Sequence, residues 1–157
     1  MASSTDPSDY VVSIDELDAD ACWRLIGRPR IGRLGFVLED QPRVLPVNSA
    51  VLDRQVVFRT SGESTLGGLT DGSNVTFECD DTDPVAESGW SVVVRGRLSA
   101  VVDPGELARL AESDLHPWVP GVKDRWMKIT PTAVTGRVVK RHRDLPPGVH
   151  VPSLPPD

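Results

Sequence analysis

Three strand-like runs decide the fold of this chain: Arg33-Leu-Gly-Phe-Val-Leu38, Arg43-Val-Leu-Pro-Val-Asn-Ser-Ala-Val-Leu52 and Gln55-Val-Val-Phe-Arg-Thr60. They lead directly into a polar turn, Ser61-Gly-Glu-Ser-Thr65. Backbone N–H groups and hydroxyls converge where strands open onto such a turn at the start of a helix, and together they form a natural anion site. We therefore interpret this turn as a place where a phosphorylated cofactor could dock.

The rest of the chain extends the pattern to a mainly β fold. We predict strands at about 31–38, 42–52, 54–60, 74–79, 90–102, 126–129 and 133–139, with Asp53-Arg54 as a two-residue hairpin loop. Short helices are predicted at 14–26, opened by a capping box of Ser13 and Glu16, at 64–70, and at 103–112 after the N-cap Asp103. Six to seven antiparallel strands with only short helices favour a small β-barrel.

The chain divides into one domain and two tails. With 157 residues it is most simply a single domain, which we place at 13–141. We expect a disordered N-terminus at 1–12 and an extended, proline-rich C-terminal tail at 142–157.

Composition and charge exclude several classes of function. The net charge of −6 argues against non-specific binding to nucleic acid. No apolar run approaches the roughly 18 residues of a transmembrane helix, so no membrane partner is expected, and the N-terminus does not resemble a signal peptide. Cys22 and Cys79 lack CxxC spacing and read as buried free thiols in a reducing compartment. We expect a cytoplasmic protein.

Several pieces of the chain resemble, in the same order, the pyridoxamine 5'-phosphate oxidase-like family of FMN-binding split β-barrels. The matching pieces are Cys22-Trp23-Arg-Leu, Gly32-Arg-Leu-Gly-Phe36, Pro42-Arg-Val-Leu-Pro-Val-Asn48, Val57-Phe-Arg-Thr60, Val75-Thr-Phe-Glu78, Gly89-Trp-Ser-Val-Val-Val-Arg-Gly96, Ile129-Thr-Pro131 and Val134-Thr-Gly-Arg137. Together they span roughly residues 13 to 141.

The resemblance implies a homodimer that binds FMN at its interface and takes up hydride at flavin N5 from a small-molecule substrate. Arginine forks suit phosphate oxygens, and hydroxyls add neutral donors. Carried over to this chain, the cofactor-binding residues are Arg43, Val44, Pro46, Val47, Asn48, Arg59, Thr60, Ser64 and Thr65 at the phosphate and ribityl end, with Trp90 and Ser91 beside the ring.

Two departures from the family pattern leave alternatives open. Many relatives carry a basic residue where this chain has Thr65, which removes one charge-assisted phosphate contact. Asn48 stands where true pyridoxamine phosphate oxidases use lysine, and no Arg-x-His lies near the C-terminal strand, so vitamin B6 oxidation is not expected. The alternatives are a reductase that uses the 8-hydroxy-5-deazaflavin coenzyme and a non-enzymatic, stress-associated flavin-binding dimer.

Each candidate residue also has a purely structural interpretation. Arg59 and Arg43 could be strand-end charges in water, Ser64 and Thr65 could only cap a helix, and Trp90 could pack in a core or a dimer interface. The Asp80–Asp83 run lacks the glycine and glutamate of a calcium loop, so no metal site is predicted. No catalytic acid or base is evident, and any catalysis would come from the cofactor.

Overall fold

The computed structural model describes residues 10–27, 30–62, 64–66, 69, 71–113 and 124–143. This part of the chain forms seven antiparallel strands and two short helices. In chain order they are β1 (Tyr10–Leu17), α1 (Ala19–Ile26), β2 (Arg30–Leu38), β3 (Gln41–Leu52), β4 (Gln55–Thr60), β5 (Asn74–Asp83), β6 (Ser88–Ala100), α2 (Pro104–Ala111) and β7 (Arg125–Arg143).

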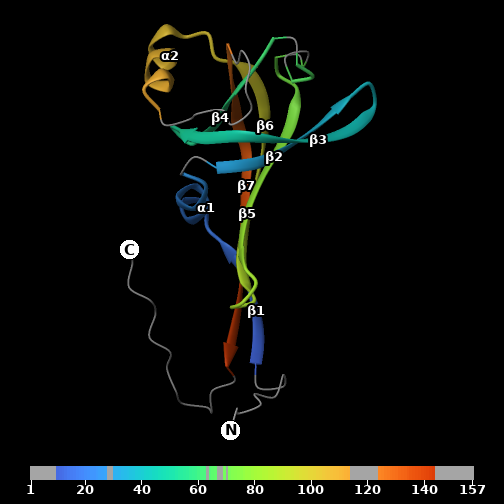
Figure 1. Cartoon of the computed structure of the whole chain (residues 1–157), viewed down its shortest axis with the longest axis vertical. Helices are drawn as coiled ribbons and strands as arrows, with labels where there is room; N and C mark the ends of the chain where they lie inside the picture. Colours follow the sequence, from blue (N-terminus) through green and yellow to red (C-terminus); the bar gives the residue numbers. More distant parts are fainter. Residues whose placement is uncertain are drawn as a thin grey trace.

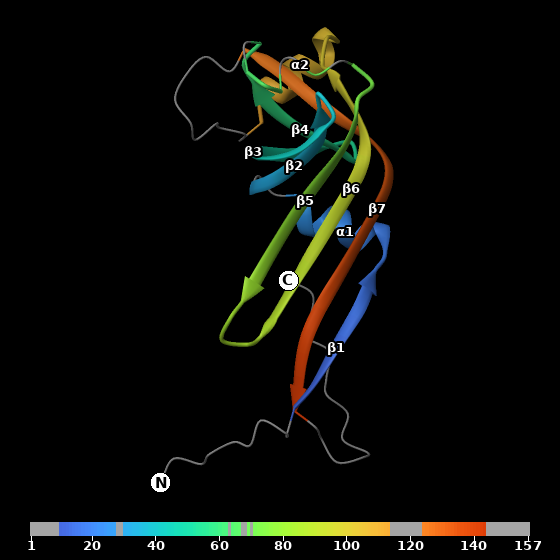
Figure 2. The ribbon, with the colours of Figure 1, turned by 90° about the vertical axis from the view of Figure 1, so that its right-hand side faces the viewer.

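The strands close into a barrel. They pair in the order β1-β7-β4-β3-β2-β5-β6, and a further pairing of β7 with β6 joins the two sides. Six strands therefore form a ring, and β1 is added to the free edge of β7. Beyond the ring, the far ends of β5, β6 and β7 continue side by side with β1 as an arm (Figures 1 and 2). The predicted split β-barrel fold is confirmed.

β7 is one continuous strand of 19 residues, where we predicted two strands at 126–129 and 133–139. Pro131 reads as a break in the sequence, but it lies opposite Gly96, next to a β-bulge. Thr132 is the extra residue of the bulge, and its hydroxyl donates to the carbonyl of Arg95 over 3.2 Å. Bulges are among the few places where proline is tolerated inside a sheet, so the strand bends there without ending.

Gly96 permits this bend. A Cβ atom at Gly96 would lie 2.3 Å from the carbonyl oxygen of Thr130 and 2.8 Å from a methyl carbon of Ile129. Only glycine allows the two backbones to approach so closely, and the predicted bend of the strand at Gly96 therefore has a steric cause.

The N-terminal helix prediction is wrong at its start. Residues 10–17 form β1, including residues 10–12 that we assigned to the disordered N-terminus, and the N-cap of α1 is Asp18 rather than Ser13. Asp18 Oδ1 accepts from the Ala21 N–H at 2.7 Å. The segment forms a strand because it pairs over its whole length with β7, a partner 119–133 residues away along the chain that local patterns cannot reveal.

Other local predictions have mixed outcomes. The helix expected at 64–70 is absent from the described residues of that segment, which form turns and bends at Ser64–Leu66 and Leu69. The Asp53-Arg54 hairpin loop is confirmed, with φ of 50° and 57° as a type I′ turn requires. Helix α2 is also confirmed, with Asp103 as N-cap and Pro104 at its start. Residues 1–9 and 144–157 of the two predicted tails lie outside the described residues.

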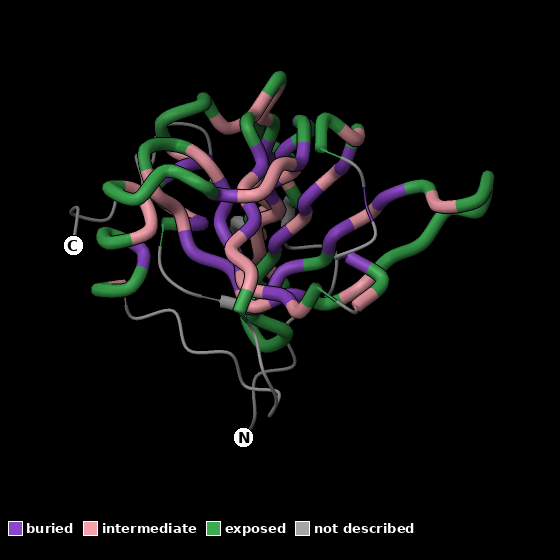
Figure 3. Tube along the Cα trace, turned by 90° about the horizontal axis from the view of Figure 1, so that it is seen from above, coloured by how far each residue is buried: buried purple, intermediate pink, exposed green. Residues whose placement is uncertain are grey.

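Two hydrophobic clusters form the interior, which Figure 3 shows as buried positions between the strands. The larger fills the barrel and includes Phe58 and Phe77, and the smaller lies under α2 around Val57 and Leu110. Both cysteines are buried free thiols, as predicted. Burial, followed by the nearby Asp18 carboxylate, raises the pKa of the Cys22 thiol, which makes it a poor nucleophile.

Substituting Gly136 should destabilise the fold through α1. A Cβ atom at Gly136 would lie 2.6 Å from Cys22 Sγ and 3.1 Å from a methyl carbon of Leu17. We expect Gly136→Ala to lower the free energy of unfolding by about 1–3 kcal/mol in urea denaturation. Because Cys22 Sγ is the nearest obstacle, Gly136→Ala should cost less in a Cys22→Ala background.

Gly35→Ala is the matched control for that experiment. Its new Cβ would meet only ordinary contacts, the nearest at 3.6 Å. If the two alanine variants were equally stable, close approach of α1 to β7 would not be the reason for glycine at position 136.

Candidate functional site

The barrel wall and the arm share one open sheet surface, which we call the outer face. Cross-strand pairing places its side chains in register on the side opposite the main core. None of these positions is buried, whereas most alternate positions within the barrel are, including Leu34 and Phe36 on β2, Phe77 and Cys79 on β5 and Val92 and Val94 on β6. The outer face comprises Val12, Ile14, Glu16, Ile31, Arg33, Gly35, Val37, Pro42, Val44, Pro46, Asn48, Thr76, Glu78, Asp80, Thr82, Gly89, Ser91, Val93, Arg95, Ala133, Thr135, Arg137 and Val139.

Apolar side chains gather on the outer face. Five of the seven large hydrophobic side chains that are exposed in the described part of the chain belong to it: Val12, Ile14, Ile31, Val37 and Val44. Exposed apolar residues scattered singly are ordinary, but a set confined to one face marks a binding surface.

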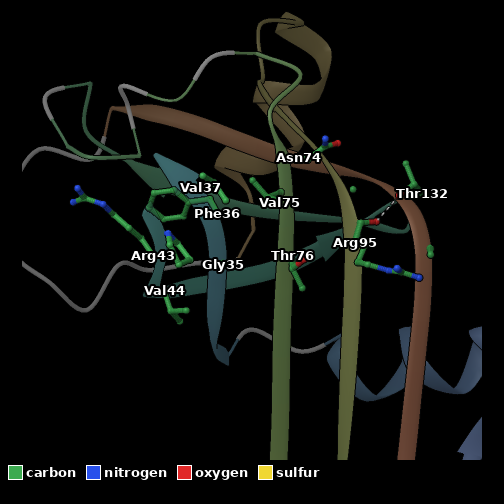
Figure 4. A pocket seen from close by; sticks show the side chains of 13 residues that line it. Gly35, Phe36, Val37, Arg43, Val44, Asn74, Val75, Thr76, Arg95 and Thr132 are labelled. Carbon is green, nitrogen blue, oxygen red and sulfur yellow. Dashed lines mark hydrogen bonds between the residues drawn. The ribbon is translucent and has the colours of Figure 1, made fainter. Parts of the chain in front are cut away.

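The outer face is also hollowed. A depression of about 650 Å³ lies between the tip of the β2–β3 hairpin and the bend of β6, with Arg43 and Arg95 on opposite sides (Figure 4). Two smaller depressions, of about 360 and 450 Å³, meet at Ser91 and Arg137 on the arm. The face is therefore concave at the barrel end and on the arm, with an arginine beside each depression.

One charged cluster on the outer face is internally neutralised. Arg33 bridges Glu78 at 2.9 Å and Asp80 at 2.6 Å, and the two carboxylates raise the pKa of its guanidinium. Since its charge is already compensated, Arg33 is a poor candidate for binding an anionic ligand. As an exposed pair network it contributes little to stability.

The predicted residues of β3 divide between the two sides of the sheet. Val44, Pro46 and Asn48 lie on the outer face, where a ligand can reach them. The Val47 side chain is 8% exposed and packs in the core, so only its main chain could contact a ligand. Arg43 is paired only loosely with Glu39, at 3.9 Å.

Arg59 has an unusual environment. Its Nε atom is buried and has no hydrogen-bond partner, and no ion pair in the described part of the chain involves its guanidinium. Instead, the guanidinium carbon lies 5.3 Å from the ring centroid of Trp126, its cross-strand neighbour. A half-buried cation without a carboxylate partner is an electrostatic site for an anion.

The predicted hydroxyl donors bind one another. Thr60 Oγ1 and Ser64 Oγ are 2.6 Å apart, and Ser64 Oγ donates to the carbonyl of Ser61 at 2.7 Å. The Ser64 proton therefore goes to Ser61, and Thr60, which is 3% exposed, donates to Ser64. This network fixes the turn, whereas Thr65 is exposed beside it.

Trp90 and Ser91 lie on a different part of the sheet from Arg59. Trp90 is opposite Val138 on β7, whereas Arg59 is opposite Trp126. Twelve residues of strand separate these β7 positions, about 40 Å along the backbone. Trp90 packs against the main core, and Ser91 lies on the outer face. Asn48 pairs with Ile31, Ile31 contacts Cys79, and the next residue, Asp80, pairs with Ser91, so Ser91 shares the outer face with Asn48 whereas Trp90 does not.

Sequence reasoning missed two contributors to this surface. Trp126 was read only as part of a strand, although its neighbour in space is Arg59. Val12 and Ile14 were assigned to a tail and a helix, although they line the outer face of the arm. The alternation of apolar and polar residues from Val12 to Asp15 was the available signal for a strand there.

In the described part of the chain, neither helix is long and apolar enough to cross a bilayer.

Comparison with known proteins identifies relatives for most of the chain. A family model described as pyridoxamine 5'-phosphate oxidase matches residues 18–138. An uncharacterised protein of Mycobacterium tuberculosis (strain ATCC 25618 / H37Rv) is 38% identical over 134 residues, which cover 82% of this chain and 88% of that protein.

Solved structures agree with this match. The structure of an FAD binding protein from Mycobacterium smegmatis is 36% identical with a TM-score of 0.69, and the match covers 82% of this chain and 100% of that one. A conserved protein of unknown function from Corynebacterium diphtheriae is 32% identical with a TM-score of 0.64, covering 79% of this chain and 96% of that one.

The hydroxyl network should matter for stability. Thr60→Val keeps the shape of the side chain but removes a buried hydrogen bond to Ser64, so we expect a loss of about 1 kcal/mol in the free energy of unfolding. Thr65→Val, at an exposed position of the same turn, should change it by less than about 0.5 kcal/mol. Urea denaturation measures both, and equal effects would contradict a structural role for the Thr60 hydroxyl.

Proposed function

Because this chain belongs to the pyridoxamine 5'-phosphate oxidase family, we propose that it binds a flavin, held at its phosphate end by Arg59, and acts as an oxidoreductase. One observation carries the proposal: a half-buried guanidinium with a buried, unpartnered Nε and no carboxylate to neutralise it. With no carboxylate to compensate it, the guanidinium charge is available to a phosphate, and a charge-assisted contact of this kind contributes about 1.5–3 kcal/mol.

The neighbouring residues fit a phosphorylated ligand. Asn48 and Pro46 are accessible on the outer face of β3, and the Thr60–Ser64 network holds the adjoining turn in place. Arg59 would bind the phosphate, and exposed main-chain groups of β3 would orient the ribityl chain and ring. A bound flavin supplies two-electron chemistry at N5, and the protein supplies orientation and exclusion of water.

We propose that the flavin is FMN. FAD is the alternative, and the comparison with the mycobacterial relative supports it. That relative, at 36% identity, is described as an FAD binding protein. Both flavins carry the phosphate that Arg59 would bind, so the same site serves either. Asn48, in place of a lysine, argues against vitamin B6 as the substrate.

We further propose that the outer face is covered by a second copy of this chain. Its exposed valines and isoleucines favour burial, and a homodimer supplies an equivalent surface to cover them. Trp90 packs against the main core of its own chain and not on the outer face, so it does not complete a ring site beside Asn48. In a dimer, the arm of one protomer could lie beside Arg59 of its partner.

A second candidate function is flavin binding without catalysis. The M. smegmatis relative is described only as an FAD binding protein, which favours binding without catalysis. Thr65, which stands in place of a basic residue, favours it as well. Turnover with a nicotinamide donor and a dye acceptor separates the two functions, because a carrier would bind flavin and show no donor-dependent reduction.

Titration with FMN and FAD, followed by quenching of flavin fluorescence, tests the site. Arg59→Ala removes a charge-assisted contact of about 1.5–3 kcal/mol, so affinity should fall about 10- to 150-fold. Thr65→Lys adds a cation at an exposed position and should tighten binding by up to about tenfold. Arg54→Ala, an exposed arginine paired with Asp20 instead, is the matched control and should leave affinity unchanged.

Absence of binding to both flavins at high micromolar concentration would overturn the proposal. Parallel titration with the 8-hydroxy-5-deazaflavin coenzyme then tests the remaining cofactor class. Equal effects of Arg59→Ala and Arg54→Ala would place the phosphate elsewhere.

Sedimentation velocity tests the dimer. Ile14 is 65% exposed on the outer face, so Ile14→Lys should leave the fold intact and convert the dimer to a monomer at micromolar concentration. Val85 is 94% exposed at the tip of the β5–β6 hairpin, and Val85→Lys should remain dimeric. A monomeric wild-type protein would exclude an interface-built site.

A further inference from the structure

Arg59, the proposed phosphate-binding residue, packs against a side chain that was not among the predicted site residues. Trp126 and Arg59 are directly opposite each other on β7 and β4. The guanidinium carbon is 5.3 Å from the centroid of the indole. Tryptophan is the aromatic side chain that attracts a cation most strongly, and the attraction grows when the pair is shielded from water.

Trp126 is itself fixed from the other side. It packs against the smaller core, in which Val57 and Leu110 are fully or almost fully buried. Leu110 belongs to α2, and that helix is tied to β7 by an ion pair of 2.7 Å between Lys128 and Glu106, whose side chains are 24% and 14% exposed. Trp126 therefore packs against a core to which α2 contributes and to which the ion pair anchors that helix.

This arrangement orients a cation without neutralising it. The arginines at 33, 54, 109 and 141 each pair with a carboxylate, which lowers their attraction for an anion. Arg59 is held by a neutral ring, so its full charge remains available. The same ring covers part of the guanidinium, which raises the local strength of any contact with a phosphate.

We infer that Trp126 is the positioning residue for Arg59 and sets the preference of this protein for phosphorylated flavins over riboflavin. The inference rests on the proposed flavin site. It holds that the Arg59–Trp126 stack distinguishes FMN from riboflavin, which differ only in the phosphate. Trp126 contributes through Arg59 and not through contact with the flavin ring.

The experiment compares the dissociation constants of FMN and riboflavin in four proteins: wild type, Trp126→Leu, Trp126→Phe and Arg59→Ala. We expect Trp126→Leu to weaken FMN about tenfold and to change riboflavin less than twofold, because only FMN uses Arg59. Trp126→Phe keeps an aromatic ring and should retain affinity for FMN within about threefold. Equal weakening of both ligands would show a merely structural role and overturn the inference, as would no change in either.

The double variant identifies the route of the effect. In an Arg59→Ala background, Trp126→Leu should weaken FMN no further, because the residue through which it acts is absent. An additional tenfold loss in that background would mean that Trp126 contacts the ligand directly and would overturn the inference.

A measurement without flavin separates this inference from the proposed function. The Arg59 Nε–H signal in nitrogen–proton correlation spectra should shift on addition of inorganic phosphate, with the same midpoint concentration in the wild type and Trp126→Phe and a midpoint about tenfold higher in Trp126→Leu. If the protein bound no flavin but still showed this phosphate-dependent shift, the Arg59–Trp126 pair would remain an anion-binding site although the flavin proposal had failed. Equal midpoint concentrations of phosphate in all three proteins would overturn the role of Trp126.

Discussion

Backbone hydrogen bonding along β7 is the constraint on which the rest of the structure depends. This strand pairs with β1, β4 and β6, so it closes the barrel at one end and carries the arm at the other. A strand this long, about 60 Å of backbone, can serve both parts only if it bends. The bulge at Thr132 and the absence of a side chain at Gly96 provide that bend. The hydrogen-bonded pairing of β7 with β6 continues on both sides of it.

The strand pairing also decides which chemistry is available on the surface. Because side chains alternate strictly, a single register assigns Phe77, Val92 and Gly136 to the interior and Glu78, Ser91 and Arg137 to the outer face. The exposed aliphatic residues of β1, β2 and β3 then fall on one surface, although they are distant in sequence. A binding face of this kind is a property of the closed sheet and of no single strand.

The arginines differ more in whether a carboxylate neutralises their charge than in where they lie on the surface. Arg33 lies in the centre of the outer face but is neutralised by two carboxylates, whereas Arg59 lies near its end and meets only an indole. An anion gains most where the cation has no competing partner and is shielded from water. Arg59 is therefore the electrostatic focus of the proposed site, and the hydroxyls of Thr60 and Ser64 serve chiefly to hold the neighbouring turn.

The sequence by itself determined the β-rich barrel class, most strand positions, the Asp53-Arg54 turn and the Asp103 cap of α2, because these depend on local propensity and periodicity. Arg59 was also recognisable, as a cation in an apolar run beside a hydroxyl-rich turn. Only the tertiary structure decided that residues 10–17 are a strand, that β7 continues through Pro131, and that Trp126 stacks on Arg59. All three depend on pairing between segments tens of residues apart, and the register of such pairs is set by the packing of the whole sheet rather than by any local signal.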